Sequence, residues 1–324
     1  MKAIQIQSQG EPEVLKLTNL PEPTPNADQV LVRIKASAVN PLDGIVRAGY
    51  FPIAAKPPLI LGEEASGTVE RDGAGFKAGE HVLVYGGGLG VFRDGTWAEL
   101  IAVPASSLRR LPEGISFEEG AALSNVGVTA YGALRHGGLE AGETLVVLGA
   151  TGGVGSAGVQ IGKALGARVI AVVSKSQKAA EITRLGADHV VALSDGSLAE
   201  QVQKLTDGKG ADLVLDPVGG DVTGQALAAV VTFGRVVHLG YSAGMSLTIN
   251  SLDFVAKASS ILGFNIFLVP AERSAKDFDE VVNLAAGRKY RAVVDKTFPA
   301  TEVIAATNHL DQRKGGAGKV VLTF

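Results

Sequence analysis

The chain has 324 residues, enough for two domains, and its 30 basic and 33 acidic side chains give a formal net charge of −3. Because it lacks a basic tract or an aromatic-rich basic patch, nucleic acid is not an expected partner. The sequence contains no cysteine, which excludes disulfides, thiolate catalysis and cysteine-bound zinc. The first residues turn polar too early for a signal peptide, and no apolar run approaches the roughly 18 residues that span a membrane. We therefore expect a soluble, cytoplasmic protein with no membrane partner.

Residues 1–121 are predicted to form a β-rich, barrel-like unit. Short apolar segments alternate there with turns and with a proline-rich link at 20–26. The predicted strands are 2–7, 29–38, 65–70, 81–85 and 96–103.

The pattern changes at Ser124, where a predicted helix leads into strands that alternate with helices. The strands are predicted at 144–150, 168–173, 189–193, 211–216, 234–240 and 260–267. Such alternation is typical of a doubly wound α/β fold with a parallel, here six-stranded, sheet. We therefore predict a nucleotide-binding domain over 122–267.

The tail after this domain is too short to fold alone. Its predicted elements are a helix at 272–286, a strand at 293–298, a helix at 301–312 and a last strand at 319–324. We expect it to rejoin the N-terminal unit, which would then comprise 1–121 and 268–324.

A glycine cluster follows the first strand of the nucleotide-binding domain and opens a helix that runs to about Leu165. A strand, glycine turn, helix and second strand within about 30 residues form the dinucleotide-binding βαβ unit. The glycines allow a tight bend, a close approach of the backbone to a pyrophosphate and close packing of helix on strand. Gly149 comes one residue before the usual first position, so the turn is slightly long. The predicted cofactor contacts in the turn are Ala150, Gly152, Gly153 and Val154.

The residues after the second strand bear on cofactor choice. An enzyme that prefers NAD usually has an acidic residue at this strand end, and here Val173 is followed by Ser174, Lys175 and Lys178 without one. A hydroxyl group and two lysines suit a 2′-phosphate, so NADPH is the predicted cofactor. Alternatively, the lysines are solvated residues of the next helix.

Six motifs carry a resemblance that covers essentially the whole chain. They are similar to motifs of the medium-chain dehydrogenase/reductase superfamily, in its zinc-free quinone oxidoreductase (zeta-crystallin-like) branch. The motifs are NPLDGIVRAGY at 40–50, GEEASGTVE at 62–70, VGVTAYGAL at 126–134, GATGGVGSAGVQIGKALGA at 149–167, DPVGG at 216–220 and GGAGKVVL at 315–322. The resemblance implies a six-stranded Rossmann sheet inserted into a GroES-like barrel domain.

The resemblance also shows what this chain lacks. In the zinc alcohol dehydrogenases of the superfamily, two cysteines and a histidine hold the catalytic zinc. The corresponding positions here carry Asn40, Glu63 and Asn125, and amides are poor zinc ligands. The family's structural zinc lobe would fall near 86–95, which has no cysteine. We therefore predict a metal-free site, which disfavours alcohol oxidation but not the reduction of a conjugated acceptor.

Residue roles follow from the same resemblance. It places Asn40 beside the nicotinamide and makes Tyr50 a candidate for binding a substrate carbonyl or delivering a proton. Alternatively, Pro41 and Asp43 build a turn at the end of the strand, and Tyr50 is a half-buried barrel residue. Glu63 and Glu64 are expected to anchor polar groups inside the cleft. The candidate catalytic residues are Asn40, Asp43, Tyr50 and Glu64.

Further cofactor contacts are implied elsewhere in the chain. Arg313 and Lys319, in the returning tail, correspond to a region that closes over the cofactor phosphates, with Arg313 favoured. The C-terminal ends of strands bind ligands in open α/β sheets. The remaining predicted contacts are Asn125, Thr129, Val218, Gly240, Tyr241, Phe264 and Ile266. The five histidines lack ligand spacing, and only His238 is near the expected site.

These observations predict an oxidoreductase that transfers hydride from NADPH to a quinone or an α,β-unsaturated carbonyl compound bound between the domains. The proton is expected from water or Tyr50. An enoyl-thioester reductase, or a weakly active NADPH-binding regulatory or scaffold protein, remains an alternative. A short-chain dehydrogenase is disfavoured, since no tyrosine here is followed by a lysine at the required spacing. We also expect a homodimer that pairs through the edge strand at 259–267.

Overall fold

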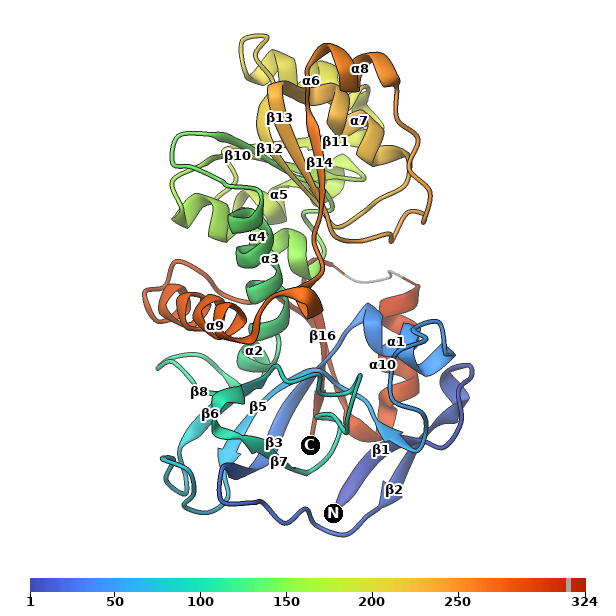
Figure 1. Cartoon of the computed structure of the whole chain (residues 1–324), viewed down its shortest axis with the longest axis vertical. Helices are drawn as coiled ribbons and strands as arrows, with labels where there is room; N and C mark the ends of the chain where they lie inside the picture. Colours follow the sequence, from blue (N-terminus) through green and yellow to red (C-terminus); the bar gives the residue numbers. More distant parts are fainter. Residues whose placement is uncertain (313–315) are drawn as a thin grey trace. The chain divides into compact units, whose positions relative to one another are not determined.

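The computed structural model describes residues 1–312 and 316–324 and divides the chain into two compact units (Figure 1). The first unit comprises Met1–Asn125 and Ala292–Phe324, and the second comprises Val126–Arg291. The sequence had placed 268–291 with the first unit, and the structure places this segment in the second. None of the helices in the described ranges is long and apolar enough to cross a membrane.

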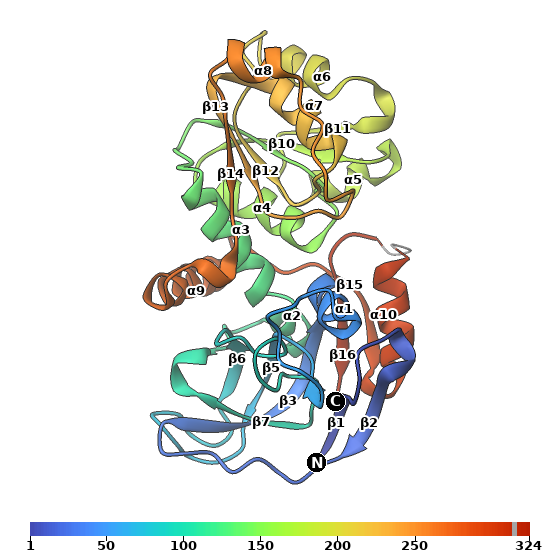
Figure 2. The same cartoon turned by 45° about the vertical axis from the view of Figure 1, so that its right-hand side comes forward.

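The second unit is built on a six-stranded sheet in the order β11-β10-β9-β12-β13-β14, in which all neighbours run parallel. The predicted doubly wound sheet is therefore confirmed. Helices lie on both of its faces (Figures 1 and 2). The strands are β9 (Thr144–Val147), β10 (Arg168–Val173), β11 (His189–Ala192), β12 (Ala211–Asp216), β13 (Val230–His238) and β14 (Ser260–Gly263). The helices that begin in this unit are α4 (Gly153–Ala164), α5 (Ala179–Thr183), α6 (Leu198–Leu205), α7 (Asp221–Ala229), α8 (Ser251–Ala256) and α9 (Ala271–Ala286).

Apolar side chains point to both faces of the sheet, which explains why helices cover both faces. In β9, Val146 belongs to a core cluster with buried residues of α6 and α7. Leu145, which points the other way because strand side chains alternate, lies under α4. An added Cβ at Gly162 of α4 would come within 2.5 Å of the Leu145 side chain. The helix therefore packs closely on the sheet, and a larger residue at Gly162 would require the Leu145 side chain to shift.

Helix α3 (Ser124–His136) connects the two units in the sequence, and α9 packs against its later part. The Asp277 carboxylate of α9 is buried and accepts hydrogen bonds from Arg135 Nε at 3.1 Å and Nη2 at 3.0 Å. Arg273, one turn earlier in α9, lies 3.3 Å from the same carboxylate. An apolar contact adds to this pairing, because a Cβ at Gly127 would meet Val281 at 2.7 Å. These contacts put 271–286 in the second unit, and local sequence pattern does not reveal them.

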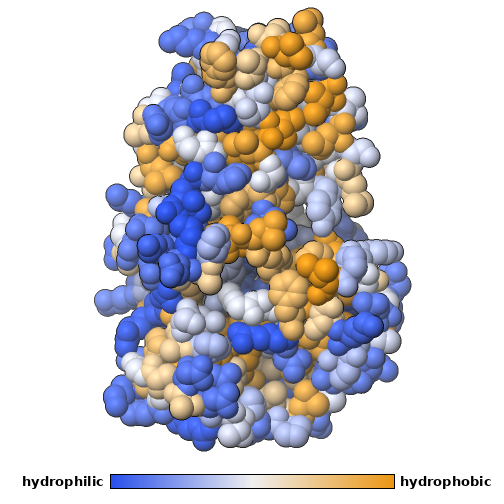
Figure 3. Space-filling view, viewed as in Figure 1, coloured by the Kyte–Doolittle hydropathy of each residue, from blue (hydrophilic) through white to orange (hydrophobic). Residues whose placement is uncertain are grey.

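The edge strand β14 is shorter than predicted. It ends at Gly263, and Ile266–Leu268 forms a single 3₁₀ turn capped by the Asn265 side chain, which accepts from the Phe267 N–H at 3.0 Å. Apolar side chains are exposed on the neighbouring α8, at Leu252 and Val255. Figure 3 shows hydrophobic residues gathered on the upper part of this face of the molecule. Dimerisation through this edge stays a prediction.

The first unit contains a seven-stranded sheet, in the order β15-β16-β3-β5-β6-β8 with β7 also paired to β3, and a three-stranded sheet, β2-β1-β4. Its alternating apolar side chains form a separate core around Val32, Ile34, Val82 and Val84. Its strands are β1 (Lys2–Ile6), β2 (Leu15–Asn19), β3 (Gln29–Val39), β4 (Leu59–Ile60), β5 (Glu64–Val69), β6 (His81–Tyr85), β7 (Leu100–Pro104), β8 (Leu108–Arg110), β15 (Val294–Pro299) and β16 (Lys319–Thr323). Its helices are α1 (Pro41–Ala48), α2 (Phe117–Ala121) and α10 (Val303–Asp311).

The tail rejoins this unit, because β16 pairs antiparallel with β3 and β15 pairs with β16. Helix α1 was not predicted from the sequence, which indicated only a turn after Asn40. The helix begins at Pro41, which suits a first helical position, and ends at Gly49 in the left-handed conformation with φ of 83°.

The α9 contact is tested by Asp277→Ala. This change removes the shared partner of Arg135 and Arg273, whose side chains are partly exposed, and hydrogen bonds to charged groups contribute about 1.5–3 kcal/mol. We expect the free energy of unfolding in urea to fall by about that amount. Glu272→Ala, on the exposed side of the same helix, is the control and should change it by less than ~1 kcal/mol. Equal effects of the two substitutions would contradict the proposed anchoring of α9.

Candidate active site

A buried polar cluster lies in the first unit where three chain segments meet. Strand β3 pairs with β16 on one side and β5 on the other, with Val39 opposite Val320 and Ser37 opposite Ala65. This register brings the residues just beyond these pairs together at one end of the strands. They are Asn40, Lys319 and Glu64, and all three are buried.

Lys319 is the centre of the cluster. Its ammonium group donates to Asn40 Oδ1 and, at 2.9 Å, to Glu64 Oε1. The second carboxylate oxygen of Glu64 accepts from the Asn125 backbone N–H at 2.6 Å. Both oxygens of the fully buried Glu64 are therefore satisfied, and the carboxylate compensates the Lys319 charge.

Asp43, in the first turn of α1, ties this helix to the segment before Glu63. Its Oδ2 accepts from the Asn40 backbone N–H at 2.7 Å and its Oδ1 from the Gly62 N–H at 3.0 Å. Burial raises the pKa of Asp43 to about 7, although these two backbone hydrogen bonds and the nearby Lys319 charge act in the opposite direction. Since its two carboxyl oxygens accept from the backbone N–H groups of Asn40 and Gly62, Asp43 fixes the positions of these two segments relative to each other.

Glu63 is the least satisfied carboxyl group of the cluster. Burial raises the pKa of Glu63 well above its ordinary value, and the negative charges of Asp43 and Glu64 add to the shift. Lys319 and a hydrogen bond from the Asn125 side chain oppose it. Glu63 Oε1 has no hydrogen-bond partner among the described residues.

Two further buried polar atoms in this part of the first unit lack a partner within the described ranges, Asn40 Nδ2 and Ser124 Oγ. Buried polar groups are nearly always paired, so unpaired ones mark a place where a ligand or water completes the bonding. Sequence reasoning missed Ser124. It also assigned Lys319 to the cofactor phosphates, whereas the structure shows Lys319 bound to Asn40 and Glu64. The sequence does contain an indication of this ion pair, because Lys319 begins an otherwise apolar strand. A lysine buried in such a strand requires a charged partner.

The donor set does not fit a zinc ion. Two of the three positions that correspond to zinc ligands carry amides, Asn40 and Asn125, and the Lys319 ammonium already binds Asn40 Oδ1. A second cation beside it would be repelled. Within residues 1–312 and 316–324, no group of three or more histidine, aspartate or glutamate side chains is placed to hold a metal.

Tyr50 does not join the cluster. It follows the end of α1, and 80% of its surface is exposed in the structure. The alternative of a half-buried barrel tyrosine is therefore wrong, and its predicted contact with substrate stays a prediction.

The glycine turn of the second unit has the predicted form. Gly149 O accepts from the Gly152 N–H at 2.9 Å, and Gly152 precedes α4 without a side-chain cap. Ala150 N–H donates to Val172 O at 3.0 Å, which ties the turn to β10. An added Cβ at Gly155 would lie 2.1 Å from Gly149 O, so only glycine fits there. The turn therefore offers the uncapped helix N-terminus that favours a phosphate group.

A second loop at the carboxyl ends of the strands is organised by Asp216. This buried carboxylate accepts from the N–H groups of Val218 and Gly219 at 2.9 and 3.0 Å and from Thr223 Oγ1 at 2.5 Å. His238 Nδ1 lies 3.0 Å from the same group, so the one histidine singled out from the sequence has a structural partner.

The other predicted cofactor residues lie on several elements of the second unit. Gly240 and Tyr241 follow β13, and a Cβ at Gly240 would lie 2.4 Å from Pro217 O. Phe264 packs its ring 5.7 Å from that of His136 of α3, the helix that also carries Thr129. Ile266 lies in the 3₁₀ turn after β14. Ser174 follows β10 and is exposed, Lys178 ends the next 3₁₀ turn, and Arg313 lies outside the described residues.

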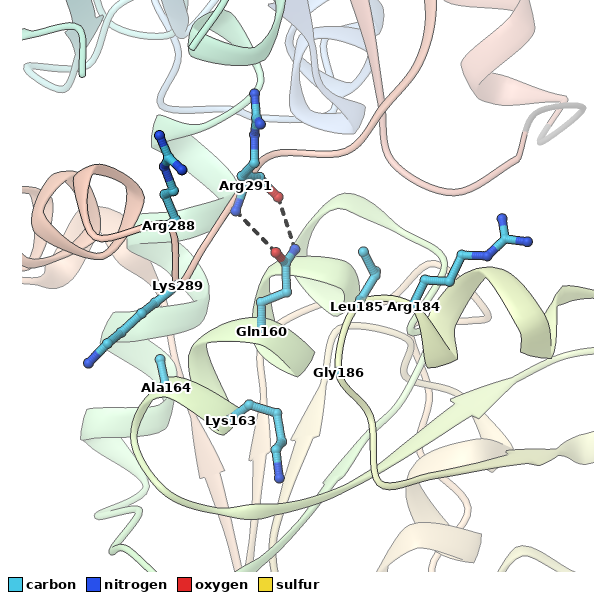
Figure 4. Close-up of a pocket in the computed structure, with 9 residues that line it drawn as sticks. All are labelled: Gln160, Lys163, Ala164, Arg184, Leu185, Gly186, Arg288, Lys289 and Arg291. Atoms are coloured by element: carbon cyan, nitrogen blue, oxygen red, sulfur yellow. Dashed lines mark hydrogen bonds between the residues drawn. The ribbon is translucent and has the colours of Figure 1, made fainter. Parts of the chain in front are cut away.

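A basic pocket of about 660 Å³ lies elsewhere in the second unit (Figure 4). Gln160 of α4 holds one wall by exchanging hydrogen bonds of 2.9 and 3.0 Å with the Arg291 backbone. The charged ends of Arg184, Arg288 and Lys289 point away from one another in Figure 4, and Lys163 is paired with Asp188 at 2.8 Å. Gln160 is also roughly 10 Å along α4 from its N-terminus, at 1.5 Å per residue. The pocket is thus separate from the glycine turn and has no converging charges.

Comparisons with known proteins agree with this architecture. Residues 26–113 match the family model of the alcohol dehydrogenase GroES-like domain, and residues 153–306 match that of the zinc-binding dehydrogenases. A quinone oxidoreductase of Pseudomonas aeruginosa is 32% identical over 99% of both chains. The chain belongs to the medium-chain dehydrogenase/reductase superfamily, in its quinone oxidoreductase branch. It is an oxidoreductase of a family whose members bind nicotinamide cofactors.

Two further relatives show the range of this family. The solved structure of a quinone oxidoreductase from Pseudomonas syringae pv. Tomato superimposes with a TM-score of 0.86 at 31% identity, covering 100% of this chain and 99% of that one. A protein of Sulfurisphaera tokodaii named NAD-dependent alcohol dehydrogenase is 31% identical over 99% of both chains.

The buried carboxyl groups generate a prediction about pH and stability. Because the folded state binds the Glu63 proton more tightly than the unfolded chain, this group stabilises the fold below its ordinary pKa of 4.5. The contribution is lost as the pH rises through the raised pKa of the folded state. Glu63→Gln cannot lose a proton, so its free energy of unfolding should exceed that of the wild type at pH 8 and differ little from it at pH 4.

Urea titrations at pH 4, 6 and 8 measure this difference. Glu113→Gln, the same substitution at an exposed position, is the control and should follow the wild type at each pH. The residual pH dependence of Glu63→Gln is expected to report Asp43, whose raised pKa acts in the same direction. A variant that is destabilised equally at every pH would show that Glu63 is ionised in the folded protein.

Proposed function

We propose that the protein is a zinc-independent reductase that transfers hydride from NADPH to a quinone or an α,β-unsaturated carbonyl compound. The observation that carries the proposal is the donor set at Asn40, Glu63 and Asn125, with the Lys319 ammonium beside it. Alcohol oxidation in this superfamily depends on a Lewis acid that stabilises an alkoxide, and this set does not fit a metal ion. Quinones and enones take hydride into a conjugated system and need only a hydrogen bond to the oxygen that becomes negative.

The bound reduced nicotinamide would supply the hydride, and the chain would supply position and polarity. The turn at Gly149–Gly155 offers backbone N–H groups to the cofactor phosphates. Asn40 Nδ2 is a buried donor with no partner among the described residues, and so suits an acceptor oxygen. Reduction of a quinone to a hydroquinone consumes one hydride and one proton, and reduction of an enone adds them to the two carbons of the double bond. We assign the proton to water or Tyr50, which is exposed.

A panel of acceptors tests this function. With NADPH we expect turnover of 1,4-benzoquinone, 9,10-phenanthrenequinone or 2-cyclohexen-1-one, followed by the loss of NADPH absorbance and unchanged by a chelator. Crotonyl-CoA tests the enoyl-thioester alternative, and ethanol with NADP⁺ and with NAD⁺ tests an alcohol dehydrogenase. Alcohol oxidation that requires added zinc would overturn the proposal. Cofactor binding without turnover of any acceptor would favour a binding protein.

Cofactor preference is proposed to come from the residues after β10. Val173 is buried, so a 2′-phosphate would contact the residues that follow it, Ser174 and Lys178. A partly exposed charge-assisted hydrogen bond is worth about 1–2 kcal/mol, or roughly tenfold in affinity. Lys178→Ala should therefore weaken NADPH binding about tenfold and leave NADH binding within twofold, as measured by titration of nucleotide fluorescence. Lys209→Ala, an exposed lysine of the same unit, is the control. Equal losses for both cofactors would rule out a phosphate contact by Lys178.

A further inference from the structure

The Lys319 contact decides how the Asn40 amide is oriented. A lysine ammonium has three donors and no acceptor, so the Asn40 atom that faces it must be Oδ1. The amide nitrogen Nδ2 then points elsewhere. It is buried and has no hydrogen-bond partner in the described part of the chain.

We propose that Lys319 is a positioning residue, which fixes the Asn40 amide so that Nδ2 is presented as the hydrogen-bond donor to the carbonyl oxygen of the acceptor. The identity of that oxygen rests on the proposed function. In this view the Lys319 ammonium group organises the site in a unit that matches the family model of the alcohol dehydrogenase GroES-like domain.

The contacts around Lys319 give it the rigidity that this role requires. It opens β16, which pairs with β3, and its charge is bound by Glu64 at 2.9 Å. Glu64 is held in turn by the Asn125 N–H at 2.6 Å, and the Asn40 backbone by Asp43 at 2.7 Å. Asn40 is thus held at its backbone and at its side-chain oxygen, with only Nδ2 available to a ligand.

The charge of Lys319 also makes Asn40 a better donor. A hydrogen bond from an ammonium group to Oδ1 draws electron density toward the oxygen, which leaves the Nδ2 protons more positive, because hydrogen bonds in a chain polarise one another. The acceptor oxygen gains negative charge only as hydride arrives. A donor held in place beforehand therefore favours the transition state over the ground state.

Asn40→Asp separates the two ends of the amide. The aspartate keeps an acceptor for Lys319 but has no N–H to donate. We expect kcat with a quinone to fall about 10²-fold, with an unchanged affinity for NADPH and an unchanged melting temperature. Lys319→Met should lower kcat about tenfold or more. Because Lys319 acts through Asn40, the double variant should be no slower than Asn40→Asp. Asn26→Asp, at an exposed position, is the control and should keep full activity.

Two kinetic outcomes would overturn the proposal. One is a kcat of Asn40→Asp within twofold of the wild type, which would show that a hydrogen bond from Nδ2 does not contribute to the reaction. The other is a double variant whose loss is the product of the two single losses, which would mean that Lys319 acts independently of Asn40.

A second measurement does not depend on turnover. In protein labelled with ¹⁵N in asparagine side chains, the Asn40 resonances are identified by their absence in Asn40→Asp. Addition of 2-cyclohexen-1-one should shift them in the wild type and not in Lys319→Met. If no acceptor in the panel is reduced and this shift is still seen, the proposed function fails and the positioning role stands. Absence of the shift in the wild type would overturn the positioning role itself.

Discussion

The ion pair between Lys319 and Glu64 joins positions 255 residues apart in the chain, and both side chains are buried. A single buried charge of either sign costs several kcal/mol, so each of the two residues stabilises the other. Removing one partner would leave a charge inside an apolar barrel. Their pairing depends on the register of β3 between β5 and β16, and the orientation of Asn40 depends on the pairing. The arrangement of these side chains thus follows from the strand register of the sheet.

Burial raises the pKa values of the two neighbouring carboxyl groups, and the charge of Lys319 opposes this shift. Three carboxyl groups, Asp43, Glu63 and Glu64, share this region with one lysine, and Glu64 uses the ammonium directly. For Asp43 and Glu63, burial is the largest cause of the raised pKa, and the negative charge of Glu64 adds to it. Asp43 keeps two backbone donors and has a pKa of about 7, while Glu63 has an oxygen without a partner among the described residues. The site therefore combines one fixed cation with carboxyl groups that readily hold protons.

In the second unit, backbone geometry shapes the loops at the carboxyl ends of the strands. Its turn at Gly149–Gly155 depends on close backbone approach, with no room for a side chain at Gly155. Asp216 shapes the neighbouring loop by accepting from two backbone N–H groups, so that Val218 is held by backbone geometry. The glycine turn suits phosphate groups, which are recognised by N–H donors at a helix N-terminus. The first unit thus carries the buried polar cluster, and the second carries the glycine turn.

Much of this could be derived from the sequence, because it depends on local pattern. The strand and helix periodicities located the six parallel strands, and the glycine spacing identified the turn. The absence of cysteine excluded a thiolate zinc site. The motifs singled out Asn40, Asp43 and Glu64, which lie in one buried cluster, and their part in catalysis stays a prediction. The sequence could not show contacts between residues far apart in the chain. These are the pairing of α9 with α3 through Asp277 and the binding of Lys319 to Asn40 and Glu64. It also did not show that β14 ends at Gly263. Periodicity and motif spacing record only which residues are near in the chain, whereas strand register and buried charge pairing decide which residues meet.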